Sequence, residues 1–178
     1  KWVVIAGIIG IVVGMVGTAF HYGLQYVTEY RNVHPFVILG LPLGGLLIVW
    51  LYHAAGRADD QGTNSVIAAV RSEEKLSFRT APLIFVSSII THLFGGSAGR
   101  EGAALQMGGS IGNGIGKFFR LNEKDMHVAV MCGMSAAFAA LFGTPMAAAI
   151  FSLEVISVGV MYYTALMPCL IASLMAAG

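Results

Sequence analysis

Long apolar stretches separated by short polar clusters dominate the chain of 178 residues. Aspartate, glutamate, lysine and arginine are absent from six stretches: 2–28, 32–56, 80–99, 102–116, 126–153 and 155–178. A membrane-spanning helix needs about 20 apolar residues, with about 17 to 25 the usual range. Five of the stretches are therefore long enough to cross a bilayer. The stretch 102–116 is glycine-rich and too short, which predicts a half-helix or a helix buried within protein.

Turn and capping residues divide the stretches further. Pro35 and Pro82 suit first helical turns, Asn122 is a candidate N-cap, and Thr144-Pro145 is a typical helix opening, while Pro168 should bend the last helix. The helices expected are 2–28, 36–55, 63–74, 80–93, 102–118, 123–141, 145–157 and 160–175. About eight tilted and broken helices of unequal length predict an all-α membrane protein.

Glycines recur at a spacing of four residues, which places them on one face of a helix. Small residues at this spacing allow two helix backbones to approach closely inside a membrane. The spacing predicts packing faces at Gly10 and Gly14, at Gly40 and Gly44, and at Gly108, Gly112 and Gly116.

Composition excludes several classes of protein. Hydrophobic residues make up 57% of the chain and charged residues 11%, whereas an ordinary soluble domain carries about 25% charge. A net charge of +1 is far too small for a nucleic-acid-binding stripe, and the apolar content excludes a disordered tail and a soluble enzyme. Cys132 and Cys169 lie in apolar stretches, so neither a disulfide framework nor a metal site is predicted.

The pattern predicts a multi-pass integral protein of the cell membrane. Residues 1–17 begin with a base and continue apolar, as a signal peptide does, but the apolar pattern runs past Phe20 without a persuasive cleavage site. The segment 57–79 contains four bases, whereas 29–34 contains one. The positive-inside rule therefore places 57–79 and Lys1 in the cytoplasm, and 29–34 outside.

Two of the nine acidic residues, Glu101 and Glu154, lie within the apolar body of the chain. An ionised side chain in the middle of a membrane costs about 2.5–3.5 kcal/mol on insertion scales, so such residues normally face a cavity, a partner or a pathway. Glu154 comes late in the helix predicted from residue 145. Two interpretations of Glu154 remain: it makes a contact between helices, or it lies on a proton route.

Glu101 stands in the glycine-rich segment 95–102, where a helix is predicted to begin. The first amides of a helix lack internal partners and its dipole is positive at that end, so a helix beginning at membrane depth is a ready anion site. The Glu101 carboxylate would fill that site until it is protonated or swings away. An ion pair of Arg100 with Glu101 in a surface loop is the alternative. The segment 62–65 opens a second short helix with exposed amides and two hydroxyls.

The segment Gly99-Arg100-Glu101-Gly102, followed by Gln106 and by Gly108-Gly109, resembles the CLC family of chloride channels and chloride/proton exchangers. Two weaker similarities stand in the expected order. Residues 62–65 lie where the family has a Gly-Ser-Gly-Ile-Pro box, and 143–154 lie where it begins another pore-side helix. The resemblance implies that residues 1–178 are the N-terminal half of an inverted-repeat transport domain, with the second half absent.

The resemblance also implies roles for individual residues. Glu101 is the expected gating glutamate, which blocks the anion path when it is ionised and carries the proton in exchangers. Glu154 aligns with the first acid of a pair whose second member is an inner proton relay in exchangers, and that second position is Val155 here. The anion-binding residues expected are Gly62, Thr63, Asn64, Arg100, Gly102 and Ala103.

The activity implied is transmembrane halide transport, as proton-coupled antiport of fluoride or chloride. Ala103 stands where the family usually has proline, and the segment 62–65 lacks the Gly-Ile-Pro ending. Both departures are similar to the fluoride-exporting branch, so fluoride is favoured. A passive chloride channel of the same family is the alternative.

The partners expected are a halide anion, protons, the lipid bilayer and a second copy of the chain, without nucleic acid, cofactor or metal. The homodimer is implied by the family alone and would form through the helices 145–157 and 160–176. A hypothesis of another class is an intramembrane serine hydrolase, because the segment 95–99 fits the Gly-x-Ser-x-Gly elbow around Ser97. A purely structural membrane scaffold is the third hypothesis.

Overall fold

The computed structural model describes residues 2–57, 62–71, 77–156 and 163–178. Regular structure within these ranges consists of eight α-helices and one 3-10 helix, which confirms the all-α prediction. The elements are α1 (Trp2–Val33), η1 (Pro35–Gly40), α2 (Leu41–Ala54), α3 (Thr63–Arg71), α4 (Thr80–Leu93), α5 (Arg100–Phe118), α6 (Glu123–Phe142), α7 (Pro145–Glu154) and α8 (Tyr163–Ala177).

The first helix does not end where a charged residue was expected to end it. It continues past residue 28 to Val33, because glutamate and arginine are good helix formers. His34 ends it, since a residue before proline is pushed out of the helical region. The helix α5 begins at Arg100, within the segment 95–102 where a helix start is predicted. The expected residues 72–74, 157 and 160–162 of three helices lie outside the described residues.

Fewer helices are long enough to cross a membrane than the uncharged stretches predict. Three candidates among the described residues meet the requirement: Trp2–Val33, Pro35–Ala54 and Glu123–Phe142. The stretch 80–99 contributes only the 14 residues of α4, because the helix stops before Gly95 and Gly96. The stretch 126–153 is divided at Gly143, whose φ of 67° is the left-handed helix ending that glycine favours. An uncharged stretch therefore overestimates the length of a helix when glycine and proline interrupt it.

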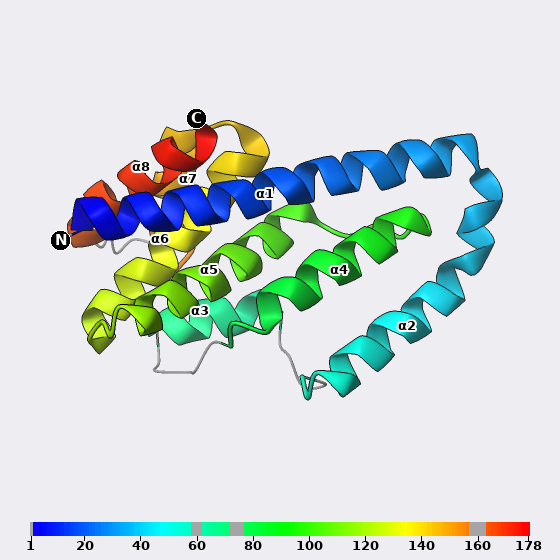
Figure 1. The fold of residues 1–178 in the computed structure, drawn as a ribbon, viewed down its shortest axis with the longest axis horizontal. Coiled ribbons are helices and arrows are strands. Elements are labelled where there is room, and N and C mark those ends of the chain that lie inside the picture. The colour runs from blue at the N-terminus through cyan, green and yellow to red at the C-terminus, as the bar shows by residue number, and fades with distance from the viewer. Residues whose placement is uncertain (1, 58–61, 72–76, 157–162) are drawn as a thin grey trace.

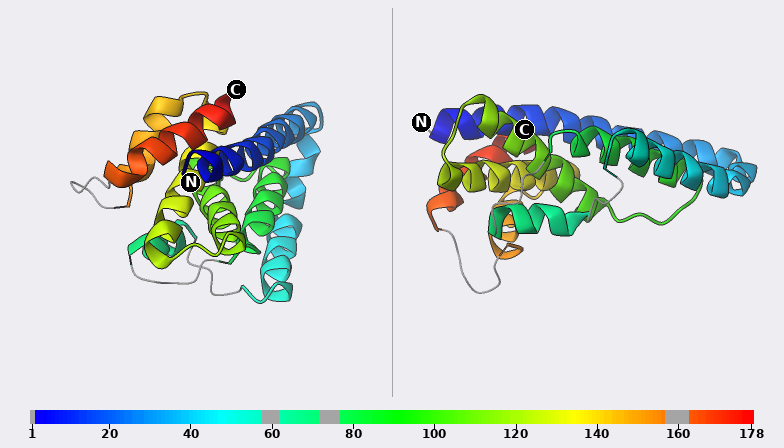
Figure 2. Two further views of the ribbon diagram at one scale, coloured as in Figure 1. Left: turned by 60° about the vertical axis from the view of Figure 1, so that its left-hand side comes forward. Right: turned by 90° about the horizontal axis from the view of Figure 1, so that it is seen from below.

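The helix α1 runs along the described part of the molecule and packs on α4, α5, α6 and α8 (Figure 1, Figure 2). Through η1 it turns into α2, and α4 packs on both arms of this hairpin. Arg31, near the end of α1, fixes the end of α4: its Nη1 donates a hydrogen bond to the His92 carbonyl at 3.0 Å. The positive charge of the guanidinium is also attracted to the negative end of the α4 dipole. On the other side, α6 packs on α1, α5, α7 and α8.

The glycine faces predicted from spacing are confirmed as close helix contacts. A Cβ on Gly108 or Gly112 would collide with the backbone of α6 at Gly133 or Ala129. Gly10 and Gly14 meet α8 in the same way, at Ala172 and Ala176, whereas Gly40 and Gly44 lie against the ring of Phe94. At the faces of Gly10 and Gly14 and of Gly108 and Gly112 the helices therefore approach to backbone contact, as close packing in a membrane requires.

Two capping predictions have different outcomes. Asn122 is the N-cap of α6, and its Oδ1 accepts a hydrogen bond from the Asp125 amide at 2.8 Å. Thr144 holds the N-cap position of α7 without a side-chain capping bond.

Candidate functional site

A cavity of about 390 Å³ lies where the starts of α3 and α5 meet the side of α4. The helices α3 and α4 both pack on α5, which brings these starts together (Figure 1). Its lining is Tyr52 of α2, Gly62 and Thr63 at the start of α3, Ile84, Ser87 and Ser88 of α4, and Gly99, Gly102, Ala103 and Gln106 around the first turns of α5. Two helix starts and several side-chain hydroxyl and amide groups therefore share one cavity.

The start of α5 has no side-chain cap. Gly99 is the N-cap residue, in an extended conformation with φ −70° and ψ 133°. The carboxylate of Glu101 lies over this start, since its Oε2 is 3.4 Å from the position that a Cβ on Gly99 would take. Arg100 and Glu101 are both exposed in the described chain. The first amides and the dipole of α5 are thus directed at a place that suits an anion.

Thr63 joins the two helix starts. Its Oγ1 accepts a hydrogen bond from Nε2 of Gln106 at 3.0 Å. The same oxygen lies 2.9 Å from the position that a Cβ on Gly102 would take, so this contact requires glycine at residue 102. A hydroxyl has one proton, and accepting from Gln106 leaves that proton available for donation to a bound group.

Ser87 and Ser88 add polar groups from the side of α4, and sequence reasoning missed both. Ser87 Oγ donates to the Leu83 carbonyl at 2.7 Å, which is the usual way for a helix to satisfy a buried serine. Two adjacent serines in the middle of a mostly apolar helix were the available signal. Tyr52 was also missed, because its position beside the cavity depends on how α2 packs.

The structure brings some of the predicted site residues together and leaves others apart. Gly62, Thr63, Gly102 and Ala103 all line the cavity. The exposed side chains of Asn64, Arg100 and Glu101 are not part of that lining. Glu154 is half-buried at the end of α7, which packs on α6 and α8. The structure therefore does not place Glu154 beside the cavity, and its role on a proton route stays a prediction.

The serine hydrolase hypothesis requires an elbow between a strand and a helix. Ser97 is exposed, and the helix α4 precedes its segment. The hypothesis also requires a histidine base near the serine. Nδ1 of His92, the histidine nearest to Ser97 in the sequence, is 2.8 Å from the Ser88 carbonyl. Within the described ranges no group of three or more histidine, cysteine or acidic side chains is placed to hold a metal ion.

These features define an integral membrane protein with broken helices around a polar cavity. The chain belongs to the voltage gated chloride channel family, whose family model matches residues 44–178. This assignment confirms the resemblance drawn from the segment around Glu101, and it places the chain in a multi-pass membrane protein.

Similar proteins are known in sequence and in structure. A chloride/fluoride channel protein of Pseudomonas syringae pathovar tomato is 40% identical over 177 residues, which are 99% of this chain and 39% of that protein. The H(+)/Cl(-) exchange transporter ClcA of Yersinia pestis is 30% identical over 85% of this chain and 35% of its own length.

Solved structures agree with the fold. The crystal structure of a CLC-type fluoride/proton antiporter matches 99% of this chain and 45% of that chain, with a TM-score of 0.92 and 39% identity. A slow cyanobacterial Cl-/H+ antiporter shares the fold, with a TM-score of 0.75 and 21% identity. The chain spans less than half the length of each of these relatives. All of them are named as channels or transporters, which supports the transport prediction over the serine hydrolase.

Proposed function

We propose that the protein containing this chain exchanges a halide, with fluoride favoured over chloride, for protons across the cell membrane. Residues 1–178 are the N-terminal half of its transport domain. The observation that carries the proposal is the meeting of the α3 and α5 starts at one polar cavity, with Glu101 in the first turn of α5. Similarity to proteins named for fluoride supports the choice of anion.

The anion is held by hydrogen-bond donors and by the partial positive charge at the starts of two helices. Backbone amides at Gly62, Thr63, Gly102 and Ala103 face it, and the dipoles of α3 and α5 add to their attraction. The Thr63 hydroxyl donates a hydrogen bond to the anion, because its oxygen already accepts one from Gln106.

Glu101 competes with the transported anion. While ionised, its carboxylate is itself the anion at the start of α5 and blocks the approach of a halide. Protonation removes the negative charge, so the carboxyl leaves the amides and a halide takes its place. Each exchange of halide for carboxylate is thereby linked to one proton on Glu101. Glu154, at the end of α7, is the proposed second proton-carrying group.

Replacing Glu101 with glutamine tests the proposal in the full-length protein reconstituted in liposomes. E101Q should abolish proton movement while anion flux continues at a changed rate, since a neutral amide neither blocks the site nor binds a proton. A fluoride or chloride electrode and a pH-sensitive dye measure the two fluxes together. The matched control is E123Q, which removes an exposed carboxylate from the first turn of α6. Unchanged coupled exchange in E101Q defeats the assignment.

A passive channel is the second candidate, and the name of the Pseudomonas relative favours it. A channel and an exchanger differ in their response to a proton gradient. An exchanger accumulates halide against its own gradient when a pH difference is imposed, whereas a channel does not. Halide uptake with fluoride and then chloride, each under an imposed pH difference, decides both the mechanism and the anion.

A homodimer through α7 and α8 is part of the proposal. Both helices present large apolar side chains on exposed faces, among them Met146, Ile150, Tyr163 and Met167. Cysteine introduced at Met167 of an otherwise cysteine-free full-length protein should cross-link two copies in membranes. Cysteine at Leu46, an equally exposed position on α2, is the control. Cross-linking that is no stronger at residue 167 contradicts this interface.

A further inference from the structure

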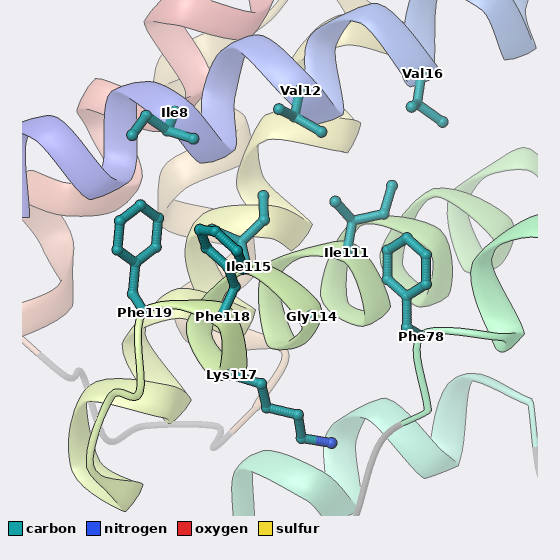
Figure 3. A pocket seen from close by; sticks show the side chains of 10 residues that line it. All are labelled: Ile8, Val12, Val16, Phe78, Ile111, Gly114, Ile115, Lys117, Phe118 and Phe119. Carbon is teal, nitrogen blue, oxygen red and sulfur yellow. The ribbon is translucent and has the colours of Figure 1, made fainter.

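A second, larger cavity of about 600 Å³ lies between α1 and α5, away from the candidate anion site. Figure 3 shows side chains of both helices directed at the space between them. The lining consists of Ile8, Val12 and Val16 of α1, Ile111, Gly114, Ile115, Lys117 and Phe118 of α5, and Phe78 and Phe119 from the segments beside α4 and α5. Its size is that of a small-molecule site, about 300–1,000 Å³.

The chemistry of the lining selects hydrocarbon. Apart from Lys117, the side chains are aliphatic or aromatic, so a water molecule inside would find no hydrogen-bond partners among them. Ile8, Val12 and Val16 belong to successive turns of α1, which is long and apolar enough to cross a membrane. One wall of the cavity is therefore an apolar helix of membrane-spanning length.

Two basic residues lie at one end of the cavity. Lys117 lines it, with an ammonium group directed away from α1 (Figure 3), and the exposed Arg120 follows two residues after the end of α5. Phe118 and Phe119 stand beside these bases, with ring centroids 5.5 Å apart and planes at 88°. Aromatic rings and long basic side chains are typical of the level where hydrocarbon gives way to headgroups.

The charged end lies toward the cytoplasm in the orientation predicted by the positive-inside rule. The end of α5 and the N-terminus are at the same end of the molecule in Figure 1, and that rule places the N-terminus inside. The cytoplasmic leaflet is the one that carries anionic lipids, and basic pockets between helices on that side bind their headgroups.

We propose that this cavity binds one acyl chain of an anionic phospholipid of the cytoplasmic leaflet, with the phosphate held by Lys117 and Arg120. The apolar walls select a hydrocarbon chain, and the two bases select the negative headgroup. The occupant enters from the membrane beside α1, without passing through the anion cavity. This site is separate from the proposed transport function and does not depend on it.

Photolabelling of the full-length protein tests the site. The protein is reconstituted in liposomes of phosphatidylcholine that contain phosphatidylglycerol with a diazirine on one acyl chain, illuminated, digested and mapped by mass spectrometry. Adducts should concentrate on peptides containing Val12 and Ile115. V12W, which fills the cavity, should remove most of that labelling, whereas L46W on the exposed face of α2 should leave it unchanged.

The bases are tested with K117Q and R120Q, which leave the apolar walls intact. Each should lower the preference for diazirine-labelled phosphatidylglycerol over the matching phosphatidylcholine about fivefold, since a base near an anionic membrane surface adds about that factor. Labelling spread evenly over α1, α2 and α5 overturns the proposal. So does absence of adducts on α1 and α5, which would show that another part of the protein or a second copy covers the cavity. The wild-type map and the two base variants decide the matter even if V12W fails to fold.

Discussion

The hydroxyl of Thr63 shows how one hydrogen bond can decide whether a side chain offers an anion its hydrogen or its lone pair. Its oxygen accepts from the Gln106 amide, so its single proton is directed elsewhere. If the partner at residue 106 accepted instead of donating, that proton would point at residue 106 and a halide would meet a lone pair. The identity of residue 106 thus matters through Thr63, without contact between Gln106 and the anion.

Gln106 variants test this positioning role. Q106E should weaken halide binding about tenfold at neutral pH, because the carboxylate would accept a hydrogen bond from the Thr63 hydroxyl, which then could not donate to the halide. A hydrogen bond to a charged group is worth about 1.5–3 kcal/mol. Q106M has a similar volume and leaves the hydroxyl proton available, so its loss should be smaller. Halide titration calorimetry on the full-length protein compares them. Equal losses in Q106E and Q106M would mean that residue 106 acts only through packing.

Arg120 is the non-glycine residue of the described chain with a positive φ, 50°. The Leu121 amide donates to the Gly116 carbonyl and the Arg120 amide to the Lys117 carbonyl, both at 3.0 Å, which forms the Schellman ending of α5. Glycine is preferred at this position because a Cβ in the left-handed region costs about 1–2 kcal/mol. An arginine there therefore combines local backbone strain with an exposed positive charge.

Replacement of Arg120 separates these two effects. R120G should raise the thermal stability of the purified protein, with a free-energy gain of up to about 1 kcal/mol, because the left-handed conformation becomes free of strain. R120A keeps the strain and removes the same charge, so it should gain nothing. Thermal unfolding in detergent measures both. A gain of equal size in R120A would assign the effect to charge instead of to the backbone.

At the scale of elements, the contact between α5 and α6 depends on missing side chains. Gly133 faces the Gly108 backbone so closely that a Cβ on either residue would meet the other's carbonyl group. Such contacts between rigid backbones cannot be relieved by a change of rotamer. The anion cavity is formed by the first turns of α5, so this contact also fixes the position of one cavity wall.

Alanine at Gly133 should therefore destabilise the protein, by about 1–3 kcal/mol as for other overpacked sites. Gly7 on α1 is the matched control, because a Cβ there meets nothing within 4 Å. G7A should be neutral or slightly stabilising, since alanine is the better helix former. Unfolding midpoints in detergent compare the two variants. Equal midpoints for G133A and the parent protein would contradict backbone contact.

Most elements could be predicted from the sequence because apolar stretches, prolines and glycines determine them locally. Asn122, Pro145 and the glycine faces are examples in which neighbours in the chain carry the information. The cavity lining could be predicted only in part. Gly62, Thr63 and Gly102 lie at helix starts that the sequence reveals, whereas Ser87, Ser88 and Tyr52 reach the cavity through the rotation of α4 and α2. That rotation is set by tertiary packing, which spacing along the chain does not encode.

At the scale of the whole molecule, the long helices can cross the hydrocarbon core of a membrane by themselves, whereas the short helices cannot. α4 has 14 residues, which is about 21 Å of helix, whereas the hydrocarbon core is about 30 Å thick. It packs on both arms of the hairpin of α1 and α2, whose apolar segments are long enough to cross. We expect α4 to depend on this hairpin for its place in the membrane.

Insertion assays with glycosylation-site reporters test this dependence. Residues 80–93 fused alone into a soluble carrier should insert poorly, and the same residues preceded by 2–79 should insert well, because the hairpin supplies the packing surface. Trp2–Val33 is the positive control, since its apolar length is sufficient by itself. Efficient insertion of the isolated segment would show that α4 needs no neighbour.

The order of helices along the chain has a consequence for biosynthesis. Each group of short helices follows a spanning one: α3 and α4 come after the hairpin, and α7 and α8 come after α6. The ribosome therefore delivers a scaffold before the pieces that depend on it. A lesion that delays entry of α1 or α6 into the translocon would leave downstream helices of normal sequence stranded at the surface, where quality-control proteases recognise them.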